Sequence, residues 1–415
     1  MKLKEKYNVP LIRFDYFKEE WDEKRFKDFT KLSQGLQIAI SSRFLEDGEH
    51  RYFYITNEFL NPNSTKKYYI ESPSENVICT VDDILMTRTG NTGKVITNIS
   101  GAFHNNFFKV DYDKFETSKM FLYYLLTSND IHKEIIIRAG NSTIPDLNHS
   151  DFYSIKTSVP SLDEQSAIGS LFRTLDDLLA SYKDNLANYQ SLKATMLSKM
   201  FPKAGQTVPE IRLDGFEGEW ERVNLETSTV RLKSFSLSRD VETKENTGMR
   251  YIHYGDIHTG RASYINDENV LPFISKDLKI TEFLKKGDLT FADASEDYKG
   301  IAEVSLLAVD PKDNVIAGLH TISLRPNKNL DSTFLYYLFK TQTFRKYGYK
   351  VGTGMKVFGI SPTNLMKYEY YHPSLDEQQA IGFYFSNLDN LIKSHQEKIS
   401  QLETLKKKLL QDMFI

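Results

Sequence analysis

The sequence predicts an α+β protein in which two mainly β globular segments alternate with two long helices. Three observations lead to this prediction: one long stretch occurs twice, both copies have the apolar spacing of a helix, and short strand-like runs precede each copy. Residues 160–201 and 373–414 align without a gap at an offset of 213 (373 − 160) and share about 19 of 42 positions. The chain is therefore an internal repeat, for which we expect pseudo-twofold symmetry.

Each repeated stretch has the features of one long helix. Pro160 and Pro373 stand where the first turn of a helix accepts proline, and Ser161 lies three residues before Glu164, the spacing of a capping box. Apolar residues then recur about every 3.56 residues, which suits long helices packed side by side. Each helix should be roughly 55–60 Å long. The residues expected between the helices are Leu175, Leu178, Tyr182, Tyr189, Leu192, Leu388, Leu391, His395, Leu402 and Leu405.

The two globular segments open alike. VPLIRFDYFKEEW (9–21) returns as VPEIRLDGFEGEW (208–220), and the two tryptophans of the chain occupy equivalent places, as expected of core anchors. Runs such as RYFYIT (51–56) are rich in aromatic and β-branched residues and predict strands. FLYYLL (121–126) and FLYYLF (334–339) each predict a short buried helix. The expected domains are residues 1–158, a long helix over 159–201, residues 202–372, and a second long helix over 373–415.

Composition limits the kind of protein that this can be. The chain has 415 residues, a net charge of −3, one cysteine (Cys79) and no run of 18 apolar residues. We expect a cytoplasmic protein without disulfides or membrane contact. Because nucleic-acid-binding proteins usually carry a basic surface, DNA binding by this near-neutral chain would depend on local patches.

Motifs for catalysis are missing from the sequence. GNTGKV (90–95) is too short for a phosphate-binding P-loop, and neither an HExxH motif, a cysteine cluster nor a G-x-S-x-G elbow occurs. We therefore expect no catalytic residue, no metal site and no cofactor in this chain.

Two stretches lack acidic residues but carry basic ones. These are residues 84–110 and residues 340–368, where the basic residues are interleaved with aromatic ones. Phosphate contacts need Lys or Arg without competing carboxylates, and base contacts need Arg, Asn, Gln or Lys on loops. The alternative is an ordinary solvated basic face.

Four repeated or distinctive motifs together resemble one family. They are the doubled P-S-L-D-E-Q helix, the P-x-I-R-x-D-x-F-x-x-E-W opening, the D-I-L-x-x-R-x-G-x-x-G-K-V loop and the Met-Phe that ends each helix. Over nearly the whole chain they resemble the DNA-specificity subunit of Type I restriction–modification enzymes, a bacterial defence system. The resemblance implies two target-recognition domains, each reading one half of a split double-stranded DNA site. It also implies that the long helices pair as an antiparallel coiled coil.

The same resemblance implies partners. Two methyltransferase subunits would dock on the long helices, carry S-adenosylmethionine and methylate adenines, and restriction (motor-nuclease) subunits would complete the complex. The second half departs from the pattern, because ADASEDYKG (292–300) replaces the glycine loop. With that departure noted, the DNA contacts expected are Arg88, Asn91, Lys94, His104, Arg138, Asn141, Ser295, Lys299, Lys346, Lys350 and Lys356.

The helices would then act as a ruler. An antiparallel pair about 55–60 Å long, at about 3.4 Å per base pair, allows at most about 17 base pairs between the domain attachments. Half-sites nearer one helical turn apart are expected. Two alternatives remain at this point: a coiled-coil adaptor without its own DNA readout, and a DNA methyltransferase or nuclease with an unrecognised site.

Overall fold

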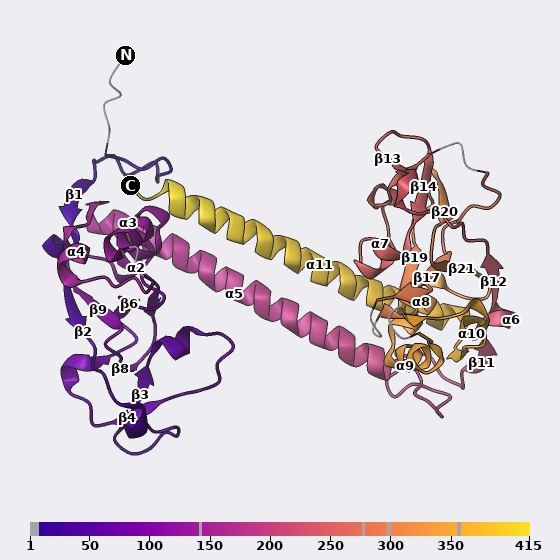
Figure 1. Ribbon diagram of the computed structural model, residues 1–415, viewed down its shortest axis with the longest axis horizontal. Helices are drawn as coiled ribbons and strands as arrows, with labels where there is room; N and C mark the ends of the chain where they lie inside the picture. Colours follow the sequence, from indigo (N-terminus) through magenta and orange to yellow (C-terminus); the bar gives the residue numbers. More distant parts are fainter. Residues whose placement is uncertain (1–7, 141–142, 276–278, 297–299, 355–357) are drawn as a thin grey trace, which may run out of the picture. The chain divides into compact units, whose positions relative to one another are not determined.

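The protein, seen here as a computed structural model, contains two compact units (Figure 1). The structure describes residues 8–140, 143–275, 279–296, 300–354 and 358–415. The first unit comprises residues 1–183 and 397–415, and the second comprises residues 184–396. Two 38-residue helices, α5 (Leu162–Lys199) and α11 (Leu375–Asp412), each contribute to both units. Among the described residues, no helix has the length and apolar character needed to span a membrane.

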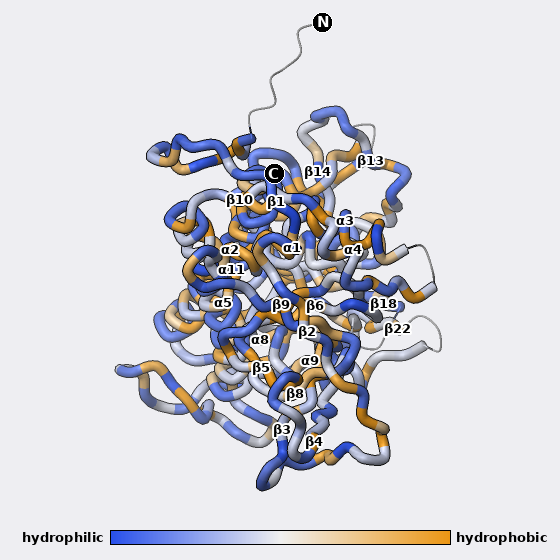
Figure 2. The backbone as a smooth tube through the Cα atoms, turned by 90° about the vertical axis from the view of Figure 1, so that its left-hand side faces the viewer, coloured by the Kyte–Doolittle hydropathy of each residue, from blue (hydrophilic) through white to orange (hydrophobic). Residues whose placement is uncertain are grey.

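The first unit is built on two four-stranded sheets, in the orders β2-β9-β6-β7 and β4-β3-β8-β5, with a separate β1-β10 pair. The pairing is antiparallel except between β3 and β8. All four residues of β6 are buried, and Figure 2, which faces this unit, colours the strand as hydrophobic. The strands are β1 (Asp22–Arg25), β2 (Thr30–Gln34), β3 (Arg51–Ile55), β4 (Tyr69–Glu71), β5 (Ile78–Cys79), β6 (Ile84–Thr87), β7 (Val95–Thr97), β8 (Gly101–Phe103), β9 (Phe107–Tyr112) and β10 (Lys156–Val159).

Short helices cover the β2-β9-β6-β7 sheet of this unit and join it to the long helices. Phe121 of α2, Phe172 of α5 and Phe414 at the end of the chain lie in one buried cluster with Trp21. The helices are α1 (Phe26–Phe29), α2 (Lys119–Thr127), α3 (Asn129–Ala139) and α4 (His149–Ser154), with 3-10 turns η1 (Ile40–Ser42), η2 (Asn57–Leu60) and η3 (Glu75–Val77).

The second unit repeats this plan with an enlarged first sheet, β12-β21-β17-β19-β15, and a second sheet, β13-β16-β14-β20. Two-stranded pairs β11-β23 and β18-β22 complete it. The second sheet again contains one parallel pair, β14 with β20, and the enlarged first sheet contains another, β15 with β19. The strands are β11 (Glu221–Asn224), β12 (Thr229–Leu232), β13 (Glu242–Thr243), β14 (Met249–Ile252), β15 (Tyr264–Ile265), β16 (Phe273–Ile274), β17 (Leu289–Ala292), β18 (Ala294–Ser295), β19 (Val304–Leu307), β20 (Asn314–Ala317), β21 (Thr321–Pro326), β22 (Phe358–Gly359) and β23 (Glu369–His372).

The helices of the second unit also follow the first. Trp220 and Phe334 share a buried cluster with Phe385 of α11 and Phe201 just after α5. The short elements are α6 (Leu225–Ser228), α7 (Tyr254–His258), α8 (Ser332–Lys340), α9 (Gln342–Val351), α10 (Pro362–Met366), η4 (Arg239–Val241) and η5 (Glu268–Val270). The predicted fold class, with its two mainly β domains, two long helices and internal repeat, is confirmed.

The repeated P-S-L-D-E-Q motif fixes the start of each long helix. Gln165 is buried and accepts a hydrogen bond from the backbone N–H of Ser118, directly before α2. Gln378 does the same for Asp331 before α8. Gly169 allows this close approach, because a Cβ there would lie 2.8 Å from Cβ of Met120.

One detail of the expected capping box is corrected. Glu164 and Glu377 do not turn back to the helix start, because each carboxylate binds an arginine of the opening segment of its own half. Arg13 donates to both oxygens of Glu164 at 2.7 Å, and Arg212 donates to both oxygens of Glu377 at 2.7 and 2.6 Å. The serine side of the box is present in the second half, where the N–H of Glu377 donates to Ser374 Oγ at 3.4 Å.

Candidate nucleic-acid interface

In the first unit the glycine loop between β6 and β7 is held in one shape by its backbone. Gly90, Asn91 and Gly93 all have positive φ (61°, 63° and 82°), a region that favours glycine and tolerates asparagine. Thr92 donates its hydroxyl to the carbonyl of Pro145 at 2.7 Å. A Cβ on Gly93 would lie 2.9 Å from the ring of His132 in α3. The loop, α3 and residues 143–147 thus form one continuous platform, which we call the first loop platform.

Arg88 lies at the edge of the first loop platform and is already engaged within it. Its Nη2 donates to Asp146 at 2.7 Å and its Nε donates to the carbonyl of Leu147 at 3.3 Å. The guanidinium carbon lies 5.5 Å from the ring centre of Phe108. The side chain remains 19% exposed, and that of Asp146 is 50% exposed. The Arg88 side chain is therefore fixed in direction while part of its surface faces solvent.

The other predicted contacts of the first half differ in accessibility. Asn91 and Lys94 are exposed on the loop. His104 is partly buried, and burial, reinforced by the charge of Arg43, lowers its pKa, so the ring is neutral at pH 7. Arg138 is held by Ser154 at 2.9 Å and by Glu134. Asn141 lies outside the described residues.

In the second unit the corresponding connection, between β17 and β19, has a different chemistry. Asp293 follows β17, and its Oδ1 lies 3.1 Å from Nδ1 of His320. The ring of Tyr254 lies 5.3 Å from that of His320. His258 contacts the carbonyl of Ala294 through Nε2 at 2.7 Å. We call Asp293, His320 and Tyr254 the second loop platform.

Ser295, one of the predicted DNA contacts, is buried. The residue is 4% exposed, because β18 pairs with β22 and Gly300 comes so close that a Cβ there would lie 2.2 Å from Ser295 Oγ. Lys299 and Lys356 lie outside the described residues.

The acid-free segment 340–368 is less basic in space than in sequence. Glu303, which directly precedes strand β19, pairs with Lys340, and its Oε2 lies 3.1 Å from Nη1 of Arg345. Lys346 and Lys350 are exposed and lie one turn apart on α9. Only part of the expected basic run therefore remains available to phosphates.

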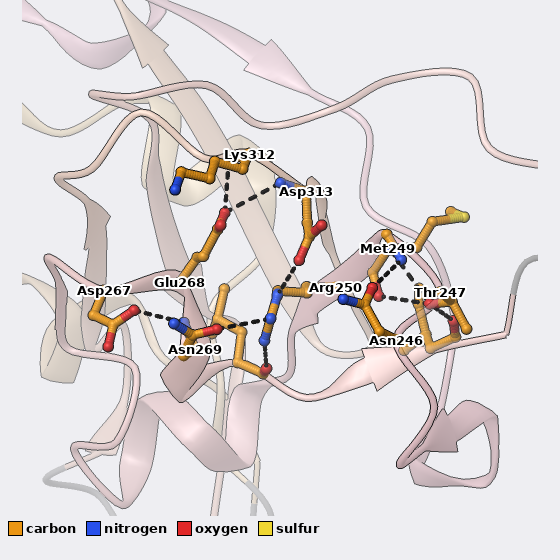
Figure 3. Close-up of polar contacts among 12 residues, drawn as sticks. Asn246, Thr247, Met249, Arg250, Asp267, Glu268, Asn269, Lys312 and Asp313 are labelled. Atoms are coloured by element: carbon orange, nitrogen blue, oxygen red, sulfur yellow. Dashed lines mark hydrogen bonds and ion pairs between the residues drawn. The ribbon is translucent and has the colours of Figure 1, made fainter.

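Arg250 anchors the second sheet of the second unit (Figure 3). It is buried, stacks at 3.8 Å on the ring of Phe273, and donates to Asp313 at 2.7 Å and Asn269 at 2.9 Å. Glu268 accepts from the backbone N–H of Lys312 at 2.7 Å. This arginine therefore ties β14 to the segment 269–273 and to the loop that contains Asp313.

Within each unit the long helices meet through a triad that sequence reasoning missed. In the first unit, Tyr124 of α2 donates to Asp176 of α5 at 2.7 Å, and Lys406 of α11 pairs with the same carboxylate. Lys406 also lies over the Tyr124 ring. All three positions carry the same residue types 213 positions away, a signal that pairwise comparison of the halves could have revealed.

The second unit contains the matching triad. Tyr337 of α8 donates to Asp389 of α11 at 2.8 Å, and Lys193 of α5 pairs with that carboxylate and lies over the Tyr337 ring. In each unit, higher residue numbers on α5 face lower numbers on α11, as Lys183–Glu403 (2.7 Å) also shows for the first unit. The helices therefore run antiparallel.

The predicted seam residues fall into two groups. Six are buried or partly buried in the two units: Leu175, Tyr182 and Leu402 in the first, and Tyr189, Leu388 and His395 in the second. The rings of Tyr189 and His395 are 5.2 Å apart. The other four, whose exposed fractions of 36–44% place them at the rim of the contact, are Leu178, Leu192, Leu391 and Leu405.

No group of three or more His, Cys, Asp or Glu side chains able to hold a metal ion occurs in the described part of the chain. The polar clusters found here are ion pairs and hydrogen-bonded anchors.

Comparison with known proteins identifies the family. The sequence pattern of the Type I restriction modification DNA specificity domain matches residues 18–188 and 225–404. The chain is 23% identical over 400 residues to the Type I restriction enzyme MjaVIII specificity subunit of Methanocaldococcus jannaschii, covering 94% of this chain and 91% of that one. It is 22% identical over 302 residues to the putative MjaX specificity subunit of the same organism, covering 70% and 66%.

Solved structures share the fold. A Type I restriction–modification S subunit from M. genitalium superimposes with a TM-score of 0.62 at 16% identity, covering 98% of this chain and 99% of that one. A chain from a study of the assembly and conformational transition of the Type I system gives a TM-score of 0.50 at 15% identity, covering 94% and 96%. The family pattern covers both halves, each of which contains one loop platform. The chain therefore belongs to the DNA specificity family of Type I restriction–modification systems, and it is a DNA-recognition subunit rather than a catalytic one.

Proposed function

We propose that this subunit reads a split DNA site, with residues 1–158 recognising one half-site and residues 202–372 the other. The long helices, residues 159–201 and 373–415, set the spacing and hold two methyltransferase subunits, to which restriction subunits are added. S-adenosylmethionine belongs to the methyltransferase subunits, and the complex works in the cytoplasm.

The main support is a contrast between constant anchors and divergent loops. Each half is fixed to its long helix by the same arginine–glutamate pair and the same Tyr–Asp–Lys triad. The two loop platforms, in contrast, carry different side chains at the same place on the sheet. Such a molecule keeps one scaffold while it reads two different sequences.

We assign phosphate contacts to the exposed lysines Lys94, Lys346 and Lys350 and a base contact to Asn91. The proposed surface is completed by Arg138, His104, Asn141, Lys299 and Lys356.

Replacing Lys94 by Ala should weaken binding of the assembled methyltransferase complex to all DNA sequences alike. The slope of log affinity against log salt should fall by about 1. Binding titrations from 50 to 200 mM salt measure this, with Lys31→Ala, at an exposed position of strand β2, as control.

The decisive experiment maps methylated adenines by single-molecule sequencing in cells that express this chain with its cognate methyltransferase subunit. A split motif with a fixed gap, lost when the chain is absent, is the expected result. A complex that assembles but modifies no site would instead favour the alternative in which this chain is a coiled-coil adaptor that does not read DNA. A continuous motif would mean that one domain does not read DNA.

A further inference from the structure

The strand registers of the two units fix which positions are equivalent where the halves depart from the repeat offset of 213. In the first unit Thr87, the last residue of β6, pairs with Phe107. In the second unit Ala292, the last residue of β17, pairs with Thr321. The next residues are Arg88 and Asp293, whose separation of 205 (293 − 88) differs from the repeat offset of 213.

Backbone hydrogen bonds support the same equivalence. The N–H of Arg88 donates to the carbonyl of Asn106 at 2.7 Å, and the N–H of Asp293 donates to the carbonyl of His320 at 3.0 Å. The carbonyl of Arg88 accepts from the N–H of Leu147 at 2.9 Å, and that of Asp293 accepts from the N–H of Ile360, also at 2.9 Å. The two residues thus occupy one position in the fold.

At this position the charge is inverted between the units. Arg88 pairs with Asp146 at 2.7 Å, and Asp293 pairs with His320 at 3.1 Å. Both pairs are partly exposed, with side-chain exposures of 19% and 50% in the first unit and 29% and 50% in the second. Each partner fixes the direction of its charged neighbour without using all of its hydrogen-bonding capacity. A guanidinium has five N–H donors, and a carboxylate has two acceptor oxygens.

We propose that this position determines sequence specificity in both domains, and that the two domains read opposite base-edge chemistry there. Arg88 donates to the O6 and N7 acceptors of a guanine in one half-site. Asp293 accepts from the exocyclic amine of a cytosine in the other half-site. Asp146 and His320 are positioning residues. This inference rests on the proposed function.

The test replaces a hydrogen-bond acceptor of the Asp293 side chain by a donor while the shape of the side chain stays the same. Asp293→Asn retains the size of the side chain but replaces one carboxylate oxygen by an NH₂ donor. In methylome mapping of the assembled complex, one position of the second half-site should lose its preference for cytosine by about 5- to 150-fold. The first half-site and the gap should not change. Arg88→Gln should give the mirror result, a lost guanine preference in the first half-site alone.

Two further variants keep the result interpretable. Arg222→Gln removes an exposed ion pair with Glu369 in the second unit and should leave the whole motif unchanged. Asp293→Glu retains the negative charge, so it should keep the cytosine preference in weakened form even if Asp293→Asn does not assemble. If Asp293→Asn assembles and its motif equals that of the wild type, or if either Asp293 variant alters both half-sites, the assignment is wrong. Absence of any split motif with the wild-type chain would instead refute the proposed function.

Discussion

At the scale of single residues, the molecule uses much of its charge to hold itself together. The Arg13–Glu164 pair is bidentate, and the carboxylate side chain is only 2% exposed. The hydrogen bonds that Arg13 donates to Glu164 raise the pKa of Arg13. Such a pair is costly to break from one side, because the remaining charge stays buried without its partner.

Replacing Arg13 by Met should therefore lower the free energy of unfolding of the chain by roughly 3–5 kcal/mol. The double variant Arg13→Met/Glu164→Leu should recover much of that loss, because no isolated charge remains. Chemical denaturation measures both. As a matched control, Arg222→Met breaks an exposed pair and should change stability little. A double variant as unstable as the single one would contradict the explanation.

Acid should destabilise the protein through two histidines, His253, which is buried, and His104, which is partly buried. Burial, followed by the charges of Arg43 and Arg239 respectively, lowers the pKa of His104 and of His253 below the ordinary 6.5. Their contribution to stability is complete above pH 6.5 and is lost as the pH falls through the lowered pKa values, since the unfolded chain binds the protons first. The melting temperature should fall from pH 7.5 to 5.5, and His104→Gln/His253→Gln should reduce that fall. His50→Gln, on an exposed side chain, serves as the control.

At the scale of the elements, the two triads mark equal lengths on both long helices. Asp176 and Lys193 are 17 residues apart on α5 (193 − 176), and Asp389 and Lys406 are 17 residues apart on α11 (406 − 389). Each triad uses one residue from each helix. Both can form together only if the helical segments between them have matching lengths.

Insertions test this directly. Four residues added after Lys183 and four after Gln396 keep the lengths equal, so both triads should survive and the complex should stay stable. The gap in the methylated motif should grow by roughly 6 Å, just under two base pairs, with unchanged half-sites. Four residues added after Lys183 alone should also change the gap, but with a lower melting temperature. If the half-site sequences change in either variant, the hypothesis that the long helices set only the gap between half-sites is wrong.

The long helices could be predicted because apolar periodicity and the repeat are visible along the chain. The helices α3, α4, α9 and α10 were not predicted. Of these, α4 and α10 have only six and five residues, too few for a helical periodicity to be visible. The triads join residues from three separate segments, so the repeat offset of 213 shows that their residue types recur but not that they meet in space. The sequence matches the segments that contain Arg88 and Asp293, but strand register is needed to fix the equivalence residue by residue, because the halves differ in length before that point.

At the scale of the whole molecule, the connection between the halves has a counterpart at the chain ends. The N–H of Ile211 donates to the carbonyl of Lys199 at 3.0 Å, within a continuous segment of the chain. The N–H of Ile12 donates to the carbonyl of Asp412, also at 3.0 Å, although the two residues lie near opposite termini. The same hydrogen bond between the end of a long helix and an opening segment thus forms twice, once within continuous chain and once between segments near the two termini.

A circular permutant should therefore fold and function. Joining Ile415 directly to Lys4 places 11 residues between Asp412 and Ile12, the number found between Lys199 and Ile211 (211 − 199 − 1). The permuted chain begins at Lys203 and ends at Pro202. It should give the same methylated motif as the original. Loss of one half-site alone would show that the new link, unlike the old one, distorts its domain.

The unlinked Ile12–Asp412 junction also has an evolutionary consequence. A gene encoding a single half would supply every anchor described here, because each half brings its own arginine, glutamate, tyrosine, aspartate and lysine. Two copies of such a product could form both junctions without a covalent link and would recognise a palindromic site. Gene duplication and fusion would then free each copy of the loop position to change, and the opposite charges of Arg88 and Asp293 are the kind of divergence that this freedom permits.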